Sequence, residues 1–138
     1  MRAARTAAGS VPSDERVARV RQKLADPDAR LDVAERDGEV VGMLLAEPFR
    51  EGGGAGDVRP GWEHISMVFV HPDHQGVGIG SELLSRLIGS GERSGFSVWT
   101  RATNEPAQGL YRSCGFAATG ELGTVRGQEL TQRWEWHP

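Results

Sequence analysis

Apolar positions along this chain follow two spacings, one typical of strands and one typical of helices. Continuous or alternating apolar runs predict strands over residues 31–35, 39–47, 63–70, 96–101, 117–122 and 128–136. Apolar residues on one helical face predict a helix from Ile79 to Ile88 and another that begins near Pro106. A further helix is expected between Ser13, a suitable N-cap, and Pro27, which ends it. This order of elements predicts a mixed α/β fold in which helices pack on a sheet.

Turn-forming residues separate these runs. Asp37-Gly38 joins the first two predicted strands and is typical of a two-residue hairpin turn. Residues 48–61 are rich in glycine and proline and are expected to form a mobile loop, while residues 1–12 are expected to form a flexible arm. A chain of 138 residues suffices for one hydrophobic core, so we expect a single domain over residues 1–138.

The most informative stretch lies between the third predicted strand and the helix that begins at Ile79. It reads Val-His-Pro-Asp-His-Gln-Gly-Val-Gly-Ile-Gly-Ser over residues 70–81, with glycines at positions 76, 78 and 80. A glycine-rich turn before a helix exposes unpaired backbone N–H groups at the positive end of the helix dipole. The stretch therefore predicts a phosphate-binding site.

Three kinds of phosphate-binding loop can be compared with this stretch. A P-loop requires a lysine followed by Ser or Thr where its helix opens, and residues 80–82 are Gly-Ser-Glu. A dinucleotide fingerprint requires a third glycine where this chain has Ser81, and a βαβ unit that is not predicted here. The third pattern, Gln-x-x-Gly-x-Gly, is filled by Gln75, Gly78 and Gly80.

This third pattern resembles the acyl-CoA pyrophosphate loop of the GCN5-related N-acetyltransferases, the GNAT family. Val70-His71-Pro72 precedes the loop, and Asn104, Tyr111 and Gly115-Phe116 follow it in the order that the family shows, so the resemblance covers residues 31–136. It implies an α/β (α+β mixed) GNAT-like fold. Such a fold has a central, mostly antiparallel mixed sheet with splayed central strands and helices on both faces.

The resemblance implies an N-acetyltransferase that moves the acetyl group of acetyl-CoA to a primary amine by direct attack. The amine acceptor, a small molecule or a peptide, is not identified by the sequence. An alternative is a catalytically silent module that binds acyl-CoA. The residues that the resemblance assigns to cofactor binding are Val68, Phe69, Val70, Gln75, Gly76, Val77, Gly78, Ile79, Gly80, Ser81, Asn104 and Tyr111.

Tyr111 is the candidate general acid, because it lies where the family carries a tyrosine that faces the cofactor sulfur. The residues alone leave a second interpretation open, since Tyr111 shares an apolar helix face with Ala107 and Cys114 and could simply pack there. Asn104 is likewise either a cofactor ligand or a helix cap.

Two residues are candidates for the base that deprotonates the amine. Glu63 and His64 lie at the start of the central strand, where the family often carries a glutamate. Strand alternation puts them on opposite faces, with His64 on the face of Ser66, Val68 and Val70. A β-bulge, which the family often has here, would reset this phase.

Charge and composition narrow the expected setting. The net charge of −3 gives no basic footprint for nucleic acid, and no apolar run approaches the ~18 residues of a membrane span. The single cysteine, Cys114, argues against disulfides and a cysteine-based metal site, so we expect no metal and a cytoplasmic location. No clear first strand precedes Leu31, and the open sheet edge that this would leave suggests a homodimer.

Overall fold

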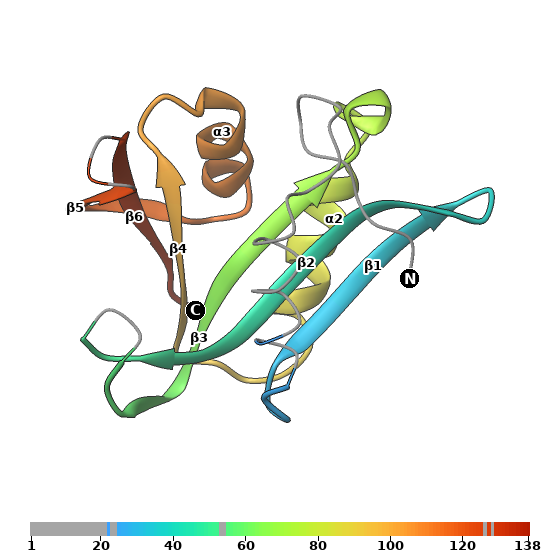
Figure 1. The fold of residues 1–138 in the computed structure, drawn as a ribbon. Coiled ribbons are helices and arrows are strands. Elements are labelled where there is room, and N and C mark those ends of the chain that lie inside the picture. Colours follow the sequence, from blue (N-terminus) through green and yellow to red (C-terminus); the bar gives the residue numbers. More distant parts are fainter. Residues whose placement is uncertain (1–21, 23–24, 53–54, 126, 128) are drawn as a thin grey trace.

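The structure is a computed structural model that describes every residue except 1–21, 23–24, 53–54, 126 and 128. The described elements follow the predicted order (Figure 1): β1 (Arg30–Arg36), β2 (Glu39–Arg50), β3 (Val58–Val70), η1 (Pro72–His74), α2 (Ile79–Ile88), β4 (Gly95–Arg101), α3 (Glu105–Ser113), β5 (Ala117–Val125) and β6 (Glu129–Trp136). The arm expected over residues 1–12 lies outside the described residues. Most of the helix expected between Ser13 and Pro27 also lies outside them.

The strands form a six-stranded sheet in the order β1-β2-β3-β4-β6-β5. Neighbouring strands are antiparallel except β3 and β4, which run parallel. The predicted mixed, mostly antiparallel sheet is therefore confirmed. A parallel pair needs a crossover connection, and α2 provides it because the chain passes from β3 through α2 to β4.

The two central strands separate along their length. β3 and β4 pair only from Trp62↔Gly95 to Ile65↔Val98. Beyond this point β3 continues to Val70 and β4 to Arg101 without pairing to each other. Figure 1 shows the two strands diverging toward the end of the sheet where α3 lies. The expected splay of the central strands is present, and we call it the fork.

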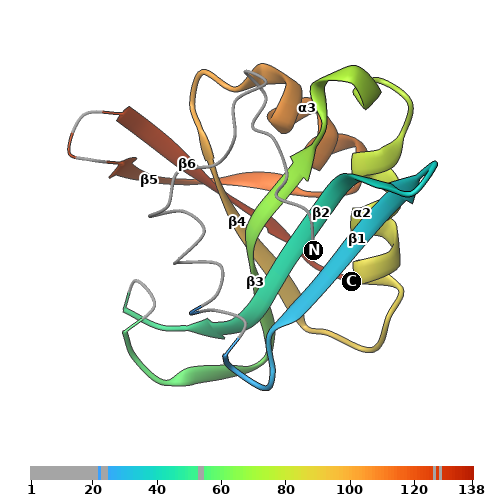
Figure 2. The ribbon, with the colours of Figure 1, turned by 45° about the vertical axis from the view of Figure 1, so that its right-hand side comes forward.

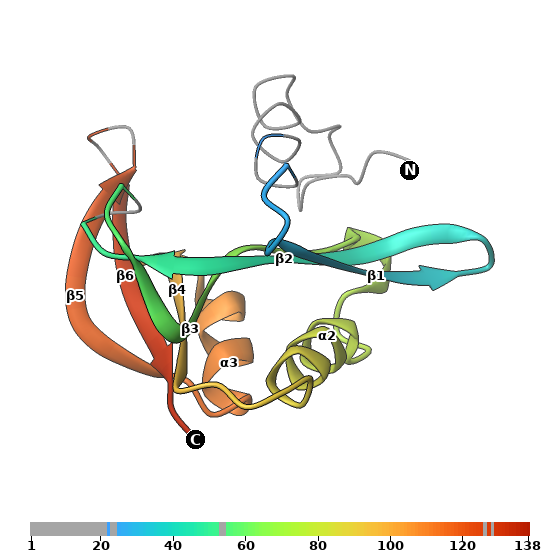
Figure 3. The ribbon, with the colours of Figure 1, turned by 90° about the horizontal axis from the view of Figure 1, so that it is seen from below.

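Helices α2 and α3 lie on the same face of the sheet (Figure 3). The apolar stripe predicted on α2 is its buried face. The core consists of Val41, Leu44, Ala46, Ile65, Ile79, Leu83, Leu84, Leu87, Phe96, Val98, Tyr111, Phe116 and Trp134. The third helix, needed for the expected cover on both faces, falls mostly outside the described residues. In the part of the chain that is described, no helix combines the length and apolar character needed to cross a membrane.

The β1–β2 hairpin closes at the predicted turn. Asp37 and Gly38 both have positive φ angles, 51° and 80°. Positive φ at both central residues is the geometry of a type I′ turn, whose twist matches that of the flanking strands. This explains why a short polar residue followed by glycine is needed at this point.

The segment 48–61 differs from the expected loop. β2 runs to Arg50 and β3 begins at Val58, so only residues 51–57 connect them (Figure 2). Pro48 and Pro60 are compatible with this extended hairpin, because they lie beyond the pairing of β2 with β1 and of β3 with β4. Their missing N–H groups therefore cost no hydrogen bond on those sides.

A β-bulge at Ser66 decides which side chains of β3 face the helices. Consecutive residues of β2 pair with β3 residues on either side of Ser66, which is an extra residue. Ile65, Val68 and Val70 consequently all pack against the core. His64 precedes Ile65 and points to the opposite face. The prediction that His64 shares a face with Val68 and Val70 is therefore wrong, and the bulge is the reason.

Candidate active site

A cavity of about 390 Å³ opens where the fork ends. Its walls are the end of β3, the turn before α2, the first turn of α2 and one face of α3. The lining residues are Val68, Phe69, Val70, His74, Gln75, Gly76, Gly78, Ile79, Gly80, Ser81, Asn104, Pro106, Ala107, Leu110 and Tyr111. The cavity thus brings together the residues predicted to bind cofactor, with the exception of Val77, which is 58% exposed.

Four lining residues were not among the predicted ones. His74 belongs to η1, and Pro106, Ala107 and Leu110 belong to the first turns of α3. The α3 residues lie on or beside the helix face of Tyr111, so helical spacing from Tyr111 is a signal that could find them. The described lining residues include no Asp, Glu, Lys or Arg. An anion in this cavity would therefore be held by backbone N–H groups and a helix dipole.

Short-range hydrogen bonds hold the turn from β3 to α2. The Gln75 side-chain amide donates to the Val70 carbonyl at 3.3 Å and so closes the turn on the end of β3. His71 Nδ1 accepts from the Asp73 N–H at 3.1 Å and caps η1. The His71 and His74 rings lie 5.7 Å apart. Even so, among the residues that the structure describes, no group of three or more His, Cys, Asp or Glu side chains is placed to hold a metal.

Two glycines of this turn have backbone conformations that other residues rarely adopt. Gly76 and Gly78 have φ angles of 80° and 88°, and a Cβ on either would meet no atom within 4 Å. Glycine is therefore required by conformation and not by space. Gly78 is the N-cap of α2, and the first intrahelical hydrogen bond runs from the Glu82 N–H to its carbonyl. The N–H groups of residues 79–81 consequently lack intrahelical acceptors where they border the cavity.

Gly80 has little space for a side chain. A Cβ there would lie 3.0 Å from Leu110 Cδ2 and 3.6 Å from Val70 Cγ2. Gly42 of β2 has as little space on the sheet side, because a Cβ there would lie 2.9 Å from Ile79 Cγ2. The two glycines let the start of α2 approach both the sheet and α3.

Tyr111 lies on the cavity wall with 6% of its surface exposed. Its ring packs against Phe116 with 5.7 Å between the ring centroids. Burial raises the pKa of the Tyr111 phenol to about 12, because desolvation disfavours the phenolate. Within the described part of the chain the hydroxyl has no hydrogen-bond partner. The phenol therefore stays protonated at neutral pH and can donate to a group in the cavity.

The titration of Tyr111 should be directly observable, because it is the only tyrosine in the chain. We expect phenolate absorbance to rise with a midpoint of about 12 in the folded protein. In denaturant the midpoint should be about 10. Because the folded pKa is the higher one, the contribution to stability is fully present below about pH 10 and is lost as the pH rises toward the folded pKa.

This loss should amount to about 3 kcal/mol of unfolding free energy. Urea unfolding at a series of alkaline pH values should detect it in the native protein and not in Tyr111→Phe. A folded-state midpoint equal to that in denaturant would show that the phenol is not desolvated.

Asn104 combines two features that the sequence left as alternatives. Its side-chain oxygen accepts from the Ala107 N–H at 3.2 Å and caps α3. It also lines the cavity. Asn104 thus fixes the start of the helix that carries Tyr111.

The two candidate bases point away from each other, and neither lines the cavity. Glu63 Oε1 accepts hydrogen bonds from Arg93 Nε and Nη2, at 3.1 and 3.0 Å. Both residues border a second hollow of about 380 Å³. His64 Nδ1 lies 2.9 Å from Ser97 Oγ, one residue before the last parallel pair of β3 and β4. Glu63 is therefore held in an ion pair, whereas His64 lies at the base of the fork.

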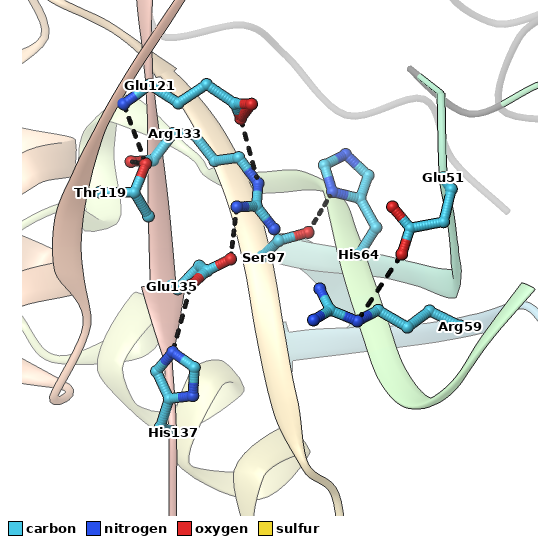
Figure 4. Close-up of polar contacts among 9 residues, drawn as sticks. All are labelled: Glu51, Arg59, His64, Ser97, Thr119, Glu121, Arg133, Glu135 and His137. Carbon is cyan, nitrogen blue, oxygen red and sulfur yellow. Dashed lines mark hydrogen bonds and ion pairs between the residues drawn. The ribbon is translucent and has the colours of Figure 1, made fainter.

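Further polar residues lie with His64 and Ser97 on the face of the sheet that α2 and α3 do not cover (Figure 4). Arg133 of β6 forms ion pairs with Glu135 and, at 3.6 Å, with Glu121. No local pattern in the sequence marks Ser97 or Arg133 as a site residue. The His64–Ser97 contact joins positions 33 residues apart, so no local spacing signals it.

The sequence is similar to known acetyltransferases. Residues 2–116 match the model of the acetyltransferase (GNAT) family. The chain is 36% identical over 96 residues to the L-amino acid N-acyltransferase MnaT of Escherichia coli, a match that covers 67% of this chain and 53% of that protein. It is 36% identical over 121 residues to the L-methionine sulfoximine/L-methionine sulfone acetyltransferase of Salmonella typhimurium, covering 84% and 66%. The chain thus spans about half to two thirds of the length of these curated relatives.

The fold is also that of a solved structure. The protein yncA from Salmonella typhimurium, determined with its cofactor acetyl-CoA, matches with a TM-score of 0.67 and 26% identity. The match covers 93% of this chain and 75% of that one. The family match includes β3, the glycine turn and α3, which together form the cavity. On this agreement of sequence and fold, the chain belongs to the GNAT family of acetyltransferases.

Proposed function

We propose that this protein is an N-acetyltransferase that takes acetyl-CoA as cosubstrate and a primary amine as acceptor. The observation that carries the proposal is the fork of β3 and β4, which opens into the cavity between the glycine turn and Tyr111. A strand that loses its neighbour has backbone groups that need partners. An extended ligand with amide groups, such as the pantetheine arm of CoA, can pair with them.

The glycine turn would hold the pyrophosphate of CoA. The free N–H groups of residues 79–81 and the positive end of the α2 dipole would attract the negative charge of the pyrophosphate. The side chains of the cavity wall are uncharged and do not supply this attraction. The pantetheine arm would then run along residues 68–70 of β3 toward the fork. In this arrangement Gln75 supports the turn through its bond to the Val70 carbonyl, and Asn104 borders the arm.

The reaction requires three proton transfers. An alkylammonium ion, with a pKa of about 10, must first lose a proton to a base before its nitrogen can attack the thioester carbon. The attacking nitrogen then loses a second proton from the tetrahedral adduct, the C–S bond breaks, and the electron pair leaves with the CoA sulfur, which takes up a proton. We assign Tyr111 as the general acid that protonates this sulfur, because its buried phenol keeps its proton at neutral pH.

We assign the role of base to His64. The position of His64 at the base of the fork supports this choice, and imidazole exchanges protons near neutral pH. Glu63 is the weaker candidate, because its Oε1 already accepts two hydrogen bonds from Arg93.

Binding of acetyl-CoA gives the first test. We expect acetyl-CoA to raise the melting temperature and ATP and NAD to leave it unchanged. A ligand that binds only the folded state adds about 2.7 kcal/mol of stability at a concentration of 100 Kd. Failure of acetyl-CoA to stabilise the protein would contradict the proposal.

Release of the CoA thiol on a panel of amines then separates an enzyme from a catalytically silent acyl-CoA-binding module. L-amino acids and L-methionine sulfoximine should head the panel, because relatives of the chain are named for them. Stabilisation by acetyl-CoA without thiol release from any amine would favour the silent module.

We further propose that residues 1–138 act as one domain, in the cytoplasm, without nucleic-acid or membrane partners. The single cysteine and the net charge of −3 support this setting. A homodimer is proposed because β1 and β5 are the edges of the sheet in the described residues. Sedimentation that finds only monomer at high concentration would contradict the dimer.

A further inference from the structure

We propose that Ser97 is a positioning residue that holds the imidazole of His64 for proton transfer, an inference that rests on the proposed function. Ser97 Oγ lies 2.9 Å from His64 Nδ1. Ser97 is 0% exposed, so its hydroxyl is shielded from solvent. The two residues are register partners across β3 and β4, one pair before the strands separate. Their contact therefore ties the imidazole to the neighbouring strand at the base of the fork.

A hydroxyl suits this position because it can both donate and accept a hydrogen bond. If His64 acts as a base through Nε2, the neutral ring must carry its proton on Nδ1. Ser97 Oγ then accepts from Nδ1–H both before and after Nε2 takes up a proton. The ring consequently keeps one orientation and one neutral tautomer through the transfer.

Charged groups lie on the strands that neighbour this pair. Glu47 is the register partner of the imidazole on β2, and Glu135 is that of the serine on β6. Glu135 contacts Arg133 and His137, and Glu121 of β5 also contacts Arg133 (Figure 4). Two carboxylates thus balance the Arg133 charge. Nδ1 of the imidazole contacts the neutral Ser97 hydroxyl, which can accept from Nδ1–H whether or not Nε2 carries a proton.

Removal of the hydroxyl tests the proposal. Ser97→Ala should lower kcat about tenfold, less than the loss of a general base itself, and should leave the Kd of acetyl-CoA unchanged. Nitrogen NMR of the imidazole should show the Nδ1–H tautomer in the native protein and a mixture of tautomers in Ser97→Ala. The pH profile of kcat should also shift in Ser97→Ala. Ser97→Thr, which keeps a hydroxyl, should recover most of the turnover.

Ser66→Ala is the matched control, because the hydroxyl of this bulge serine is buried without a partner among the described residues. It should change neither kcat nor the His64 signal. A folded Ser97→Ala protein with native kcat, or a native His64 with its neutral-state proton on Nε2, would overturn the proposal. A native protein without acetyl transfer would instead overturn the proposed function, while the NMR signal still decides whether Ser97 sets the tautomer.

Discussion

Replacing Tyr111 by phenylalanine should lower kcat about 100-fold, the typical contribution of a general acid. The phenol is the only proton donor of its kind in the cavity wall, and burial keeps it protonated at neutral pH. Without it, the CoA sulfur must leave as the unprotonated thiolate or take its proton from water. The Kd of acetyl-CoA should hardly change, because the ring itself is kept. Thiol release under saturating acetyl-CoA and equilibrium binding measure the two effects separately.

The fold should survive this change. The Tyr111 hydroxyl has no hydrogen-bond partner in the described part of the chain, so its removal leaves no buried group unsatisfied. Ser113→Ala is a suitable control, since it also removes one hydroxyl from α3 but lies away from the cavity lining. Equal turnover of Tyr111→Phe and the native protein would show that Tyr111 only packs against Phe116.

The parts of the site that the sequence predicts are those with local signals. Alternate glycines between a strand and an amphipathic helix predict a turn with exposed backbone N–H groups, and Gly76 and Gly78 have the positive φ that glycine allows. Helical spacing likewise puts Tyr111 on the buried face of α3. Each of these signals spans fewer than about ten residues, because backbone conformation and helical periodicity are set by residues close together in the sequence.

The parts that it does not predict depend on register or on distant strands. One extra residue at Ser66 reverses the faces of β3, and nothing in its side chain marks it as a bulge. The contact between His64 and Ser97 forms only because α2 returns the chain beside β3. Turn-rich composition hides the pairing of Pro48 with Glu63 and of Arg50 with Val58. Prolines are acceptable at this end of the hairpin because β2 does not pair with β1 there, nor β3 with β4.

Substitution of Gly80 by valine should weaken acetyl-CoA binding by on the order of 30-fold, which corresponds to about 2 kcal/mol. The glycine lines the cavity, and even a Cβ at this position would lie 3.0 Å from Leu110 Cδ2. The larger side chain must displace Leu110 into the cavity or push α3 away from α2. Crowding of this kind also costs about 1–3 kcal/mol of stability. Titration calorimetry with acetyl-CoA and urea unfolding measure the two losses.

Gly109→Val provides the comparison that isolates the effect of space at Gly80. It introduces the same side chain into the other helix, at a position where a Cβ meets no atom within 4 Å and which does not line the cavity. Both variants carry the poor helix propensity of valine, so a difference between them reports the contact with Leu110. If the two variants bound acetyl-CoA equally well, the closeness of α2 and α3 at Gly80 would have no part in shaping the cofactor site. Weak binding by Gly80→Val alone would show that this close contact sets the width of the cavity.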